Sequence, residues 1–396
     1  MLRDDFNWGG EAMAAAELTT IEISGSRGEL GRQHGEAARS QIGESIGYYR
    51  ESFKRITGLE WAEIRRNAPR WVQPIDAYLP GITDEIRGIA EGAGVDFAEI
   101  LALNARGELS THNPFAEAAE EGCSSYAILP EASGDGHVYC GQNWDWRCET
   151  FGTVILLRIV QPGRPTIIMQ TEAGQVGRHG ANSAGIALNA NGLGARWGKG
   201  IGVPQPIIRR RILEAPEMQT ALRAVFDSRQ SLSTNLLVTH RDGFAIDLET
   251  TPDRHGWMYP TAGLLVHTNH FIAFVPEQIA ATYRPFSVNS LWRLPRLTEG
   301  LRAAKRLGDS AEVRGAIGAA LRDHFGYPNS VCKHGDEASQ GTDLNQTIAS
   351  SIVDLTTGEY WLAAGNPCEG EYRKLPWNIY DEAGAHPRQV ATAGRA

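Results

Sequence analysis

Residues 122–147 read GCSSYAILPEASGDGHVYCGQNWDWR, and at this stretch the sequence changes from helical to strand-like patterning. Two strand-length segments, residues 124–129 and 137–143, flank a glycine-containing turn, which predicts an antiparallel hairpin. Adjacent antiparallel strands place the start of one strand beside the end of the other. The hairpin therefore brings Cys123, at the start of the first strand, close to Asp145, at the end of the second.

The sequence upstream of this hairpin, to about residue 110, is patterned for helices. Residues 28–57 carry apolar side chains at intervals of three and four, which predicts one long amphipathic helix. Further helices are predicted at residues 61–78, 82–91 and 97–104. Residues 111–122 are polar and acidic and contain a proline, so we expect them to form an exposed loop.

Downstream of the hairpin, short strands separated by Gly and Pro dominate. Strands are predicted at residues 153–160, 166–170, 185–189, 235–240, 244–249, 263–268, 347–355 and 360–364. Two helical blocks interrupt them, at residues 207–227 and 288–325, and we expect Pro295 to break the second block. Long helices combined with hairpin-linked strands predict an α+β fold of packed layers rather than repeated βαβ units.

Composition narrows the class of protein. The 38 basic and 47 acidic residues give a net charge of −9 with no long run of either sign, which argues against a nucleic-acid or anionic-membrane surface. No segment has the roughly 18 apolar residues of a membrane helix, and the acidic N-terminal residues are unlike a signal peptide. Five cysteines, an odd number, predict reduced thiols rather than a disulfide framework. We therefore expect a cytoplasmic protein.

Cys123 is the strongest candidate for chemistry, because it directly follows Gly122 at the end of the acidic loop. Most free cysteines are simply small buried side chains. The alternative is a nucleophile released by cleavage of the chain before Cys123. A freed Cys123 α-amine, with a pKa of about 7.7–8, is a suitable base for its own thiol, whose ordinary pKa is about 8.5. Gly122 suits such a junction because no side chain shields its carbonyl.

The stretch 122–147 resembles the start of the mature β chain in the acyl-coenzyme A:isopenicillin N (6-aminopenicillanic acid) acyltransferase family, whose members are cysteine N-terminal-nucleophile enzymes. The resemblance extends to residues 31–35 (GRQHG), 267–270 (HTNH) and 365–368 (GNPC). It implies a four-layer αββα N-terminal-nucleophile sandwich with a helical N-terminal segment. It also implies one precursor that cuts itself between Gly122 and Cys123, so that residues 1–122 become a helix-rich α chain and residues 123–396 a β chain, which stay associated.

The resemblance assigns roles to particular residues. Asp145, in the sequence NWD, is placed as the catalytic carboxylate, in agreement with its position in the hairpin. Asn269 is assigned to the oxyanion hole, where a neutral amide donor stabilises developing negative charge. Lys333 occupies the place where the family more often has an Arg. That departure matters, because Lys is a point charge and Arg a fixed, bidentate fork.

Weaker candidates line the expected pocket. Asn191, which precedes a glycine, is either a second oxyanion donor or a turn residue. Trp144 is expected to pack or to form a pocket wall. Residues 192–202 match no nucleotide-binding loop, so we interpret them as a loop over the pocket through which Trp197 contacts substrate. The two histidines of residues 267–270 lack a third ligand, so no metal and no cofactor are expected.

These observations favour an amidohydrolase or acyltransferase that cleaves or transfers the acyl group of a small amide through a thioester acyl-enzyme. An acyl-CoA-dependent N-acyltransferase is an alternative, although no basic phosphate site is evident. A non-catalytic ligand-binding relative and a papain-like enzyme using His137 or His179 as base are further alternatives, and the papain motif is absent. A small-molecule amide is the expected partner, and a homo-oligomer is compatible with the sequence.

Overall fold

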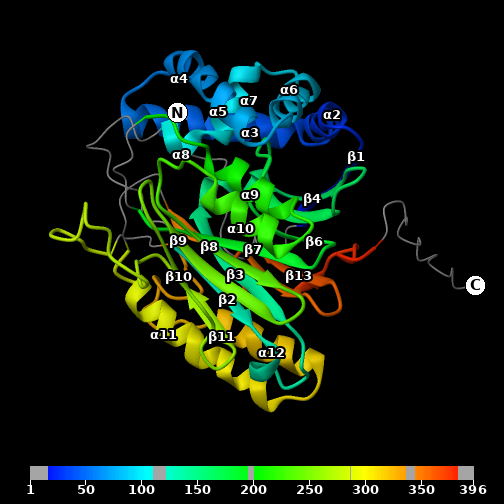
Figure 1. Cartoon of the computed structure of the whole chain (residues 1–396), viewed down its shortest axis with the longest axis vertical. Helices are drawn as coiled ribbons and strands as arrows, with labels where there is room; N and C mark the ends of the chain where they lie inside the picture. The colour runs from blue at the N-terminus through cyan, green and yellow to red at the C-terminus, as the bar shows by residue number, and fades with distance from the viewer. Residues whose placement is uncertain (1–16, 110–121, 195–199, 286, 336–343, 382–396) are drawn as a thin grey trace, which may run out of the picture.

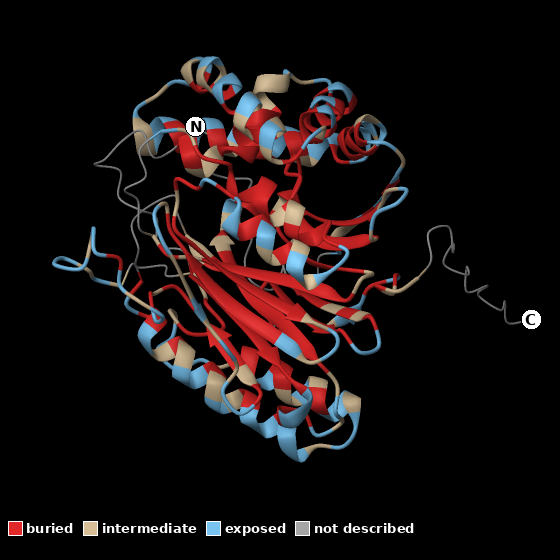
Figure 2. Ribbon diagram, viewed as in Figure 1, coloured by how far each residue is buried: buried red, intermediate tan, exposed pale blue. Residues whose placement is uncertain are grey.

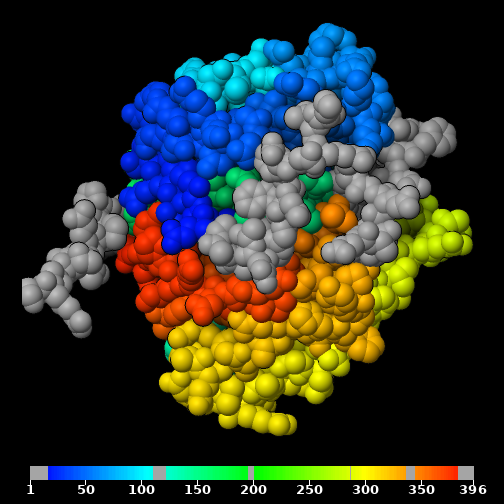
Figure 3. Space-filling view, turned by 180° about the vertical axis from the view of Figure 1, so that it is seen from behind, coloured from blue at the N-terminus to red at the C-terminus, as the bar shows by residue number. Residues whose placement is uncertain are grey.

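The computed structural model describes residues 17–109, 122–194, 200–285, 287–335 and 344–381. Two β-sheets pack face to face between two helical layers (Figure 1). One sheet has eight strands in the order β1-β4-β5-β6-β7-β8-β9-β10, and the other has six in the order β11-β2-β3-β12-β13-β14. Seen from the opposite side, the C-terminal part of the chain, coloured red, lies between the N-terminal helices and the yellow helical layer (Figure 3).

The strands of the eight-stranded sheet are β1 Thr19–Ser24, β4 Val154–Val160, β5 Ile167–Glu172, β6 His179–Asn182, β7 Ile186–Gly192, β8 Thr234–His240, β9 Phe244–Thr250 and β10 His255–Met258. Those of the six-stranded sheet are β2 Gly122–Ile128, β3 Tyr139–Arg147, β11 Leu264–His267, β12 Asn345–Asp354, β13 Glu359–Ala364 and β14 Arg373–Lys374. Both sheets are buried along most of their length (Figure 2).

The two-residue period of β4 shows why the layers form. Ile155, Leu157 and Ile159 belong to the apolar core between the eight-stranded sheet and the N-terminal helices. Leu156 points to the opposite face, into the core between the two sheets, because successive side chains of a strand alternate. A third apolar core lies between the six-stranded sheet and helices α11 and α12. The predicted four-layer αββα sandwich is confirmed.

The helices divide into two sets. Those over the eight-stranded sheet are α2 Arg27–Ala37, α3 Arg39–Thr57, α4 Trp61–Asn67, α5 Val72–Tyr78, α6 Ile82–Ala93, α7 Phe97–Asn104, α8 Arg106–Leu109, α9 Gln205–Leu213 and α10 Met218–Phe226. Those over the six-stranded sheet are α11 Ser290–Leu301 and α12 Ser310–Leu321. None of these helices is long and apolar enough to span a membrane.

Glycines decide how α2 packs on α6. A Cβ atom on Gly31 would lie 2.0 Å from the backbone oxygen of Glu85, and one on Gly35 would lie 2.2 Å from that of Ile89. The two helices therefore meet backbone to backbone. This close packing accounts for both glycines of residues 31–35.

Several predicted boundaries were wrong. The single helix expected at residues 28–57 is two helices, because the chain turns at Ala38 (φ −111°, ψ 25°) between α2 and α3. Pro295 does not break the second helical block but lies inside α11. It sits on the exposed side of that helix, where water can hydrogen-bond the carbonyl that proline leaves unpaired. The block breaks instead after Leu301.

The predicted strands correspond to strands of the structure, and four others were missed: β1, β6, β10 and β14. β1 lies in the region predicted to be helical and pairs in parallel with β4. The loop predicted at residues 111–122 lies outside the described residues except for Gly122, which is the first residue of β2.

Candidate active site

The predicted hairpin forms and lies near the centre of the six-stranded sheet. In the register of β2 and β3, Gly122 pairs with Asp145 and Cys123 pairs with Trp144. Cys123 is only 5% exposed, and its Sγ lies 3.8 Å from the backbone oxygen of Asp145. The hairpin thus holds the Gly122–Cys123 peptide bond directly beside Asp145.

Asn269 and Arg293 hold the backbone of Cys123. The Cys123 N–H donates to Asn269 Oδ1 at 2.9 Å, and Arg293 Nη1 donates to the Cys123 carbonyl oxygen at 2.7 Å. Arg293 Nη2 also donates to Asn269 Oδ1 at 2.7 Å. Asn269 Nδ2 donates to the Gly192 oxygen at 3.0 Å. In the intact chain, Asn269 rather than Asp145 is therefore the hydrogen-bond partner of the Cys123 nitrogen.

The sequence analysis missed Arg293, although the sequence marks it as a charged residue among the apolar positions of a helix. It is fully buried on α11, in a buried stripe with Ser290, Leu297 and Leu301. A charged residue in the core-facing stripe of a helix has to be paired, because burying an isolated charge is costly. Arg293 donates hydrogen bonds to Cys123, Asn269 and Asn289 Oδ1, the last at 2.7 Å from its Nε, and its charge lies close enough to Asp145 to lower the pKa of that carboxyl group.

Asp145 is fully buried. Its Oδ1 accepts a hydrogen bond of 2.6 Å from Thr347 Oγ1, whereas Oδ2 has no hydrogen-bond partner among the described residues. Burial raises the pKa of Asp145 to about 7, against the effects of Arg293, Thr347 and Lys333. A carboxyl group that titrates near neutral pH can both accept and donate a proton.

Gly122 leaves room for this carboxylate. A Cβ atom at residue 122 would lie 2.8 Å from Asp145 Oδ2 and 3.3 Å from Lys333 Cδ. Any other residue at this position would push the two side chains away from the Gly122–Cys123 bond.

Lys333 lies beside Gly122 and Asp145 and is 4% exposed. Its backbone is fixed at both polar atoms, since Lys333 N donates to Thr347 Oγ1 at 3.0 Å and Asn366 Nδ2 donates to Lys333 O at 2.6 Å. Thr347 thus bridges Lys333 and Asp145. The structure brings together Cys123 and Asp145, which the hairpin pattern predicts to be neighbours, with Asn269 and Lys333, which the resemblance assigned to the same site.

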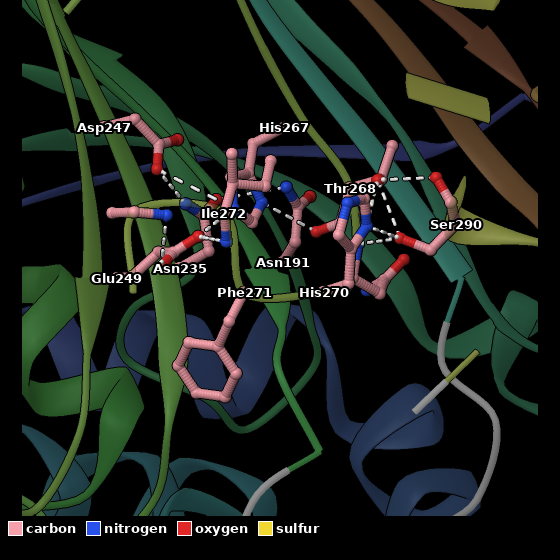
Figure 4. Close-up of polar contacts among 12 residues, drawn as sticks. Asn191, Asn235, Asp247, Glu249, His267, Thr268, His270, Phe271, Ile272 and Ser290 are labelled. Atoms are coloured by element: carbon pink, nitrogen blue, oxygen red, sulfur yellow. Dashed lines mark hydrogen bonds and ion pairs between the residues drawn. The ribbon is translucent and has the colours of Figure 1, made fainter. Parts of the chain in front are cut away.

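The two histidines on either side of Asn269 in the sequence contact Glu249 of β9 and Ser290 (Figure 4). His267 Nε2 contacts Glu249 Oε1 at 3.0 Å. Burial lowers the pKa of His267, but Asp247 and Glu249 raise it more strongly. His270 Nδ1 lies 2.7 Å from Ser290 Oγ, which accepts a hydrogen bond from Asn269 N at 2.7 Å. The two histidines of residues 267–270 are therefore engaged in separate hydrogen bonds.

The three weaker candidates, Asn191, Trp144 and Trp197, differ in where the structure places them. Asn191 is buried and donates to Ser125 Oγ at 2.8 Å and to Asn235 Oδ1 at 3.0 Å, so it links the two sheets. Trp144 is fully buried in the core between the sheets, with the Arg178 guanidinium 4.0 Å from the centre of its ring. Trp197 lies outside the described residues.

A cavity of about 140 Å³ opens beside Trp146. It is lined by the end of β7 at Gly192 and by three arginines, Arg106, Arg178 and Arg209. Arg106 and Arg178 share the carboxylate of Glu172, at 2.8 and 3.2 Å. Because Asn269 also contacts Gly192, this cavity borders the Cys123 site.

The histidines considered for a papain-like mechanism do not support one. His137 lies beyond the far end of the hairpin, where Ile128 pairs with Tyr139, and it pairs with Asp354 Oδ2 at 2.9 Å. His179 meets the ring of Trp144 edge-on, with 5.5 Å between ring centres. Burial holds the pKa of His179 well below its usual value.

A four-layer αββα sandwich with a cysteine near the start of a central strand is the architecture that the sequence resemblance implied. Residues 132–369 match the family model described as acyl-coenzyme A:6-aminopenicillanic acid acyl-transferase. The chain belongs to this family, which confirms the resemblance inferred from its sequence. It is 29% identical over 357 residues, 88% of this chain and 92% of the relative, to the acyl-coenzyme A:6-aminopenicillanic-acid-acyltransferase 40 kDa form of Emericella nidulans.

Two solved structures are also similar. A variant of conjugated bile acid hydrolase from Clostridium perfringens shares 12% identity at a TM-score of 0.42, covering 66% of this chain and 99% of that one. Penicillin V acylase from Agrobacterium tumefaciens shares 12% identity at a TM-score of 0.41, covering 61% and 83%.

Proposed function

We propose that this protein is a self-processing N-terminal-cysteine enzyme that hydrolyses or transfers the acyl group of a small amide. The observation that carries the proposal is the position of the Gly122–Cys123 bond. It lies beside a fully buried carboxylate, Asp145, whose Oδ2 has no partner among the described residues and whose pKa is about 7. The match to an acyltransferase along most of the chain supports the same class of reaction.

Self-cleavage would separate residues 1–122 from residues 123–396. Cys123 Sγ attacks the Gly122 carbonyl carbon, the thiol proton passes to a base, and the C–N bond breaks as the nitrogen takes up a proton. Asp145, whose Oδ2 lies close to Gly122, would take and return that proton. Water then hydrolyses the resulting thioester, which leaves a Gly122 carboxylate and a Cys123 with both a free thiol and a free α-amine.

Turnover would use the same atoms. The Cys123 α-amine takes the proton of its thiol, and Sγ attacks the substrate carbonyl. Asn269 is suited to the oxyanion role because its amide has two N–H donors and only one, to Gly192 O, is used among the described residues. The amine of the substrate leaves with a proton from the Cys123 amine. Water or a second amine resolves the thioester.

An acyl-CoA-dependent reaction is the second candidate, and one observation favours it. The cavity beside Trp146 carries three arginines, a basic surface that the sequence did not reveal. Glu172 neutralises one of these charges. Glu108 also lines the cavity, and the positive charge that is left suits a substrate with an anionic group, such as a carboxylate or a phosphate.

Purified protein assayed against a panel of acyl amides and acyl-CoA thioesters, with and without amine acceptors, tests the proposal. We expect release of amine from an acyl amide, or acylation of an added amine, with the Cys123→Ala protein as blank. Turnover of thioesters alone would establish the second candidate. No turnover of any member by fully processed protein would contradict the proposal.

Lys333 should contribute a positive charge to this site. A charged hydrogen bond contributes roughly 1–3 kcal/mol, so we expect Lys333→Met to lower kcat by about ten- to a hundredfold, at about 1.4 kcal/mol per tenfold. Lys333→Arg should retain part of the activity. Steady-state kinetics, with circular dichroism as a check on folding, would measure both. Wild-type kinetics in the Met variant would show that Lys333 has no role in the reaction.

A further inference from the structure

Four side chains with metal-binding atoms converge behind Lys333. His324, Cys332 and His334 come from the segment that follows α12, and Cys368 comes from the turn that follows β13. One ligand atom of each lies within 4.8 Å of all the others. The sequence analysis predicted no metal because the two histidines of residues 267–270 lack a third ligand, and it did not identify these four residues as a ligand set.

The spacing of these atoms matches a tetrahedral ligand set. The two Sγ atoms lie 3.5 Å apart. His334 Nε2 lies 3.6 Å from Cys332 Sγ, 3.3 Å from Cys368 Sγ and 3.2 Å from His324 Nε2. Zinc bonds of about 2.3 Å to sulfur and 2.0–2.1 Å to nitrogen separate tetrahedral ligands by about 3.8 Å (S···S), 3.6 Å (S···N) and 3.3 Å (N···N). These four distances agree with the tetrahedral values to within a few tenths of an ångström, and the two between His324 and the sulfur atoms are no longer than 4.8 Å.

Neighbouring groups are of the kinds that surround structural metals. His334 Nδ1, the ring nitrogen that faces away from the cluster, lies 3.6 Å from Glu369 Oε1. A carboxylate on the second nitrogen orients a metal-bound imidazole. Asn366 Nδ2 lies 3.7 Å from Cys332 Sγ, a contact that suits a thiolate. Cys332 is buried whereas His324 is exposed, so an ion can enter from the surface.

We propose that His324, Cys332, His334 and Cys368 form a Zn²⁺ site. Two thiols and two imidazoles are a ligand set that zinc binds in closed, four-coordinate structural sites. Binding forms two Zn–S and two Zn–N bonds and releases the two thiol protons to solvent. The site leaves no protein position open for a reacting group, so its role is structural.

The position of the site connects it to Lys333, which lies between two of the ligands in the sequence. Zinc would tie Cys332 and His334 to the turn that carries Cys368 and Asn366. Asn366 already donates to the Lys333 backbone oxygen at 2.6 Å. A metal here would therefore fix the backbone that places Lys333 beside Asp145 and Gly122.

Metal analysis of the full-length protein tests this proposal. Protein expressed with zinc in the medium and desalted after purification should contain about one zinc ion per 396-residue protein, as measured by inductively coupled plasma mass spectrometry. Cys368→Ser and the exposed-site variant His324→Gln should each lose most of it. Cys148→Ser, which changes a half-buried cysteine outside the cluster, should keep it. The proposal would be overturned if the wild-type protein and the three variants all contained zinc at the same level. It would also be overturned if none of them contained zinc although circular dichroism showed that each was folded.

A second measurement does not depend on any variant. Replacing zinc with Co²⁺ should give the visible absorption of a tetrahedral ion and a thiolate-to-cobalt charge-transfer band, because two sulfurs are ligands. A disulfide is the competing use of the two cysteines, and it requires their sulfurs at about 2.05 Å rather than the 3.5 Å of this structure. A Cys332–Cys368 disulfide in freshly purified protein, found by peptide mapping, would contradict the zinc site.

Discussion

Cys123→Ala should abolish both chain cleavage and turnover, and Cys123→Ser should slow both. Only residue 123 can offer a side-chain nucleophile together with an α-amine freed by cleavage at Gly122. Alanine removes the nucleophile, whereas serine keeps a weaker one with a much higher pKa. Denaturing electrophoresis of each purified variant measures cleavage, and amine release from the best acyl amide of the panel measures turnover.

Two other cysteines supply controls. Burial raises the pKa of Cys140 to about 12 and that of Cys148 to about 12, so neither is a good nucleophile at neutral pH. Cys140→Ala and Cys148→Ala should therefore leave cleavage and turnover largely intact. If Cys123→Ala protein still turned over substrate, the mechanism proposed above would have to be abandoned.

Asp145→Asn should slow self-cleavage by about a hundredfold or more, the usual contribution of a positioned acid–base group. The amide is nearly the same size as the carboxyl group and can still accept the hydrogen bond from Thr347, but it cannot carry a proton to or from the Gly122–Cys123 bond. The measurement is the time course of cleavage in freshly expressed protein. Thr347→Val, which keeps the carboxyl group but removes the hydroxyl that donates to Asp145 and accepts from Lys333 N, should slow cleavage less. Cleavage at the wild-type rate in Asp145→Asn would exclude Asp145 from the step.

The same variant has a pH signature in stability. The pKa of Asp145 is about 7 in the folded protein and about 3.9 in an unfolded chain. The unfolded state therefore loses its proton first, and the contribution of Asp145 to stability is greatest below pH 4 and declines as the pH rises towards 7. Asparagine does not titrate. Between pH 4 and pH 8, the free energy of unfolding of the Asp145→Asn variant should therefore rise relative to that of the parent protein by up to about 4 kcal/mol.

This comparison is best made in a Cys123→Ala background, in which neither the protein with Asp145 nor the Asp145→Asn variant is cleaved. Urea unfolding at several pH values gives the difference in the free energy of unfolding between the two proteins, and all other titrating groups cancel. A difference that does not change between pH 4 and pH 8 would show that Asp145 titrates as an ordinary exposed carboxylate.

Packed layers of helices and hairpin-linked strands, and the pairing of Cys123 with Asp145, could be predicted from local sequence patterns, whereas the four-layer αββα order was predicted by the family resemblance. The hairpin of residues 122–147 fixes which ends of two strands meet, and that alone places Cys123 beside Asp145. Helix boundaries were less accurate. The chain turns at Ala38 within a continuous apolar pattern, and α2 then packs backbone to backbone on α6. That tertiary contact leaves no local signal.

The residues that sequence reasoning missed depend on distant segments. Arg293 reaches Cys123 from α11, 170 positions along the chain, and only its place in a buried helical stripe marks it. Asn269 was assigned by resemblance, but its acceptance of the Cys123 N–H follows from where β11 ends beside β2. The cysteines and histidines of the proposed zinc site come from two segments that the fold alone brings together.

The most direct test of the whole account is the covalent state of the purified protein. Denaturing electrophoresis, intact mass and N-terminal sequencing should find two chains, residues 1–122 and a larger one whose first residue is Cys123, and the two should elute together on size exclusion under native conditions. The Cys123→Ala protein should stay a single chain of 43.2 kDa. A wild-type protein that is fully active as an uncut 43.2 kDa chain would contradict the claim that Cys123 acts as an N-terminal nucleophile.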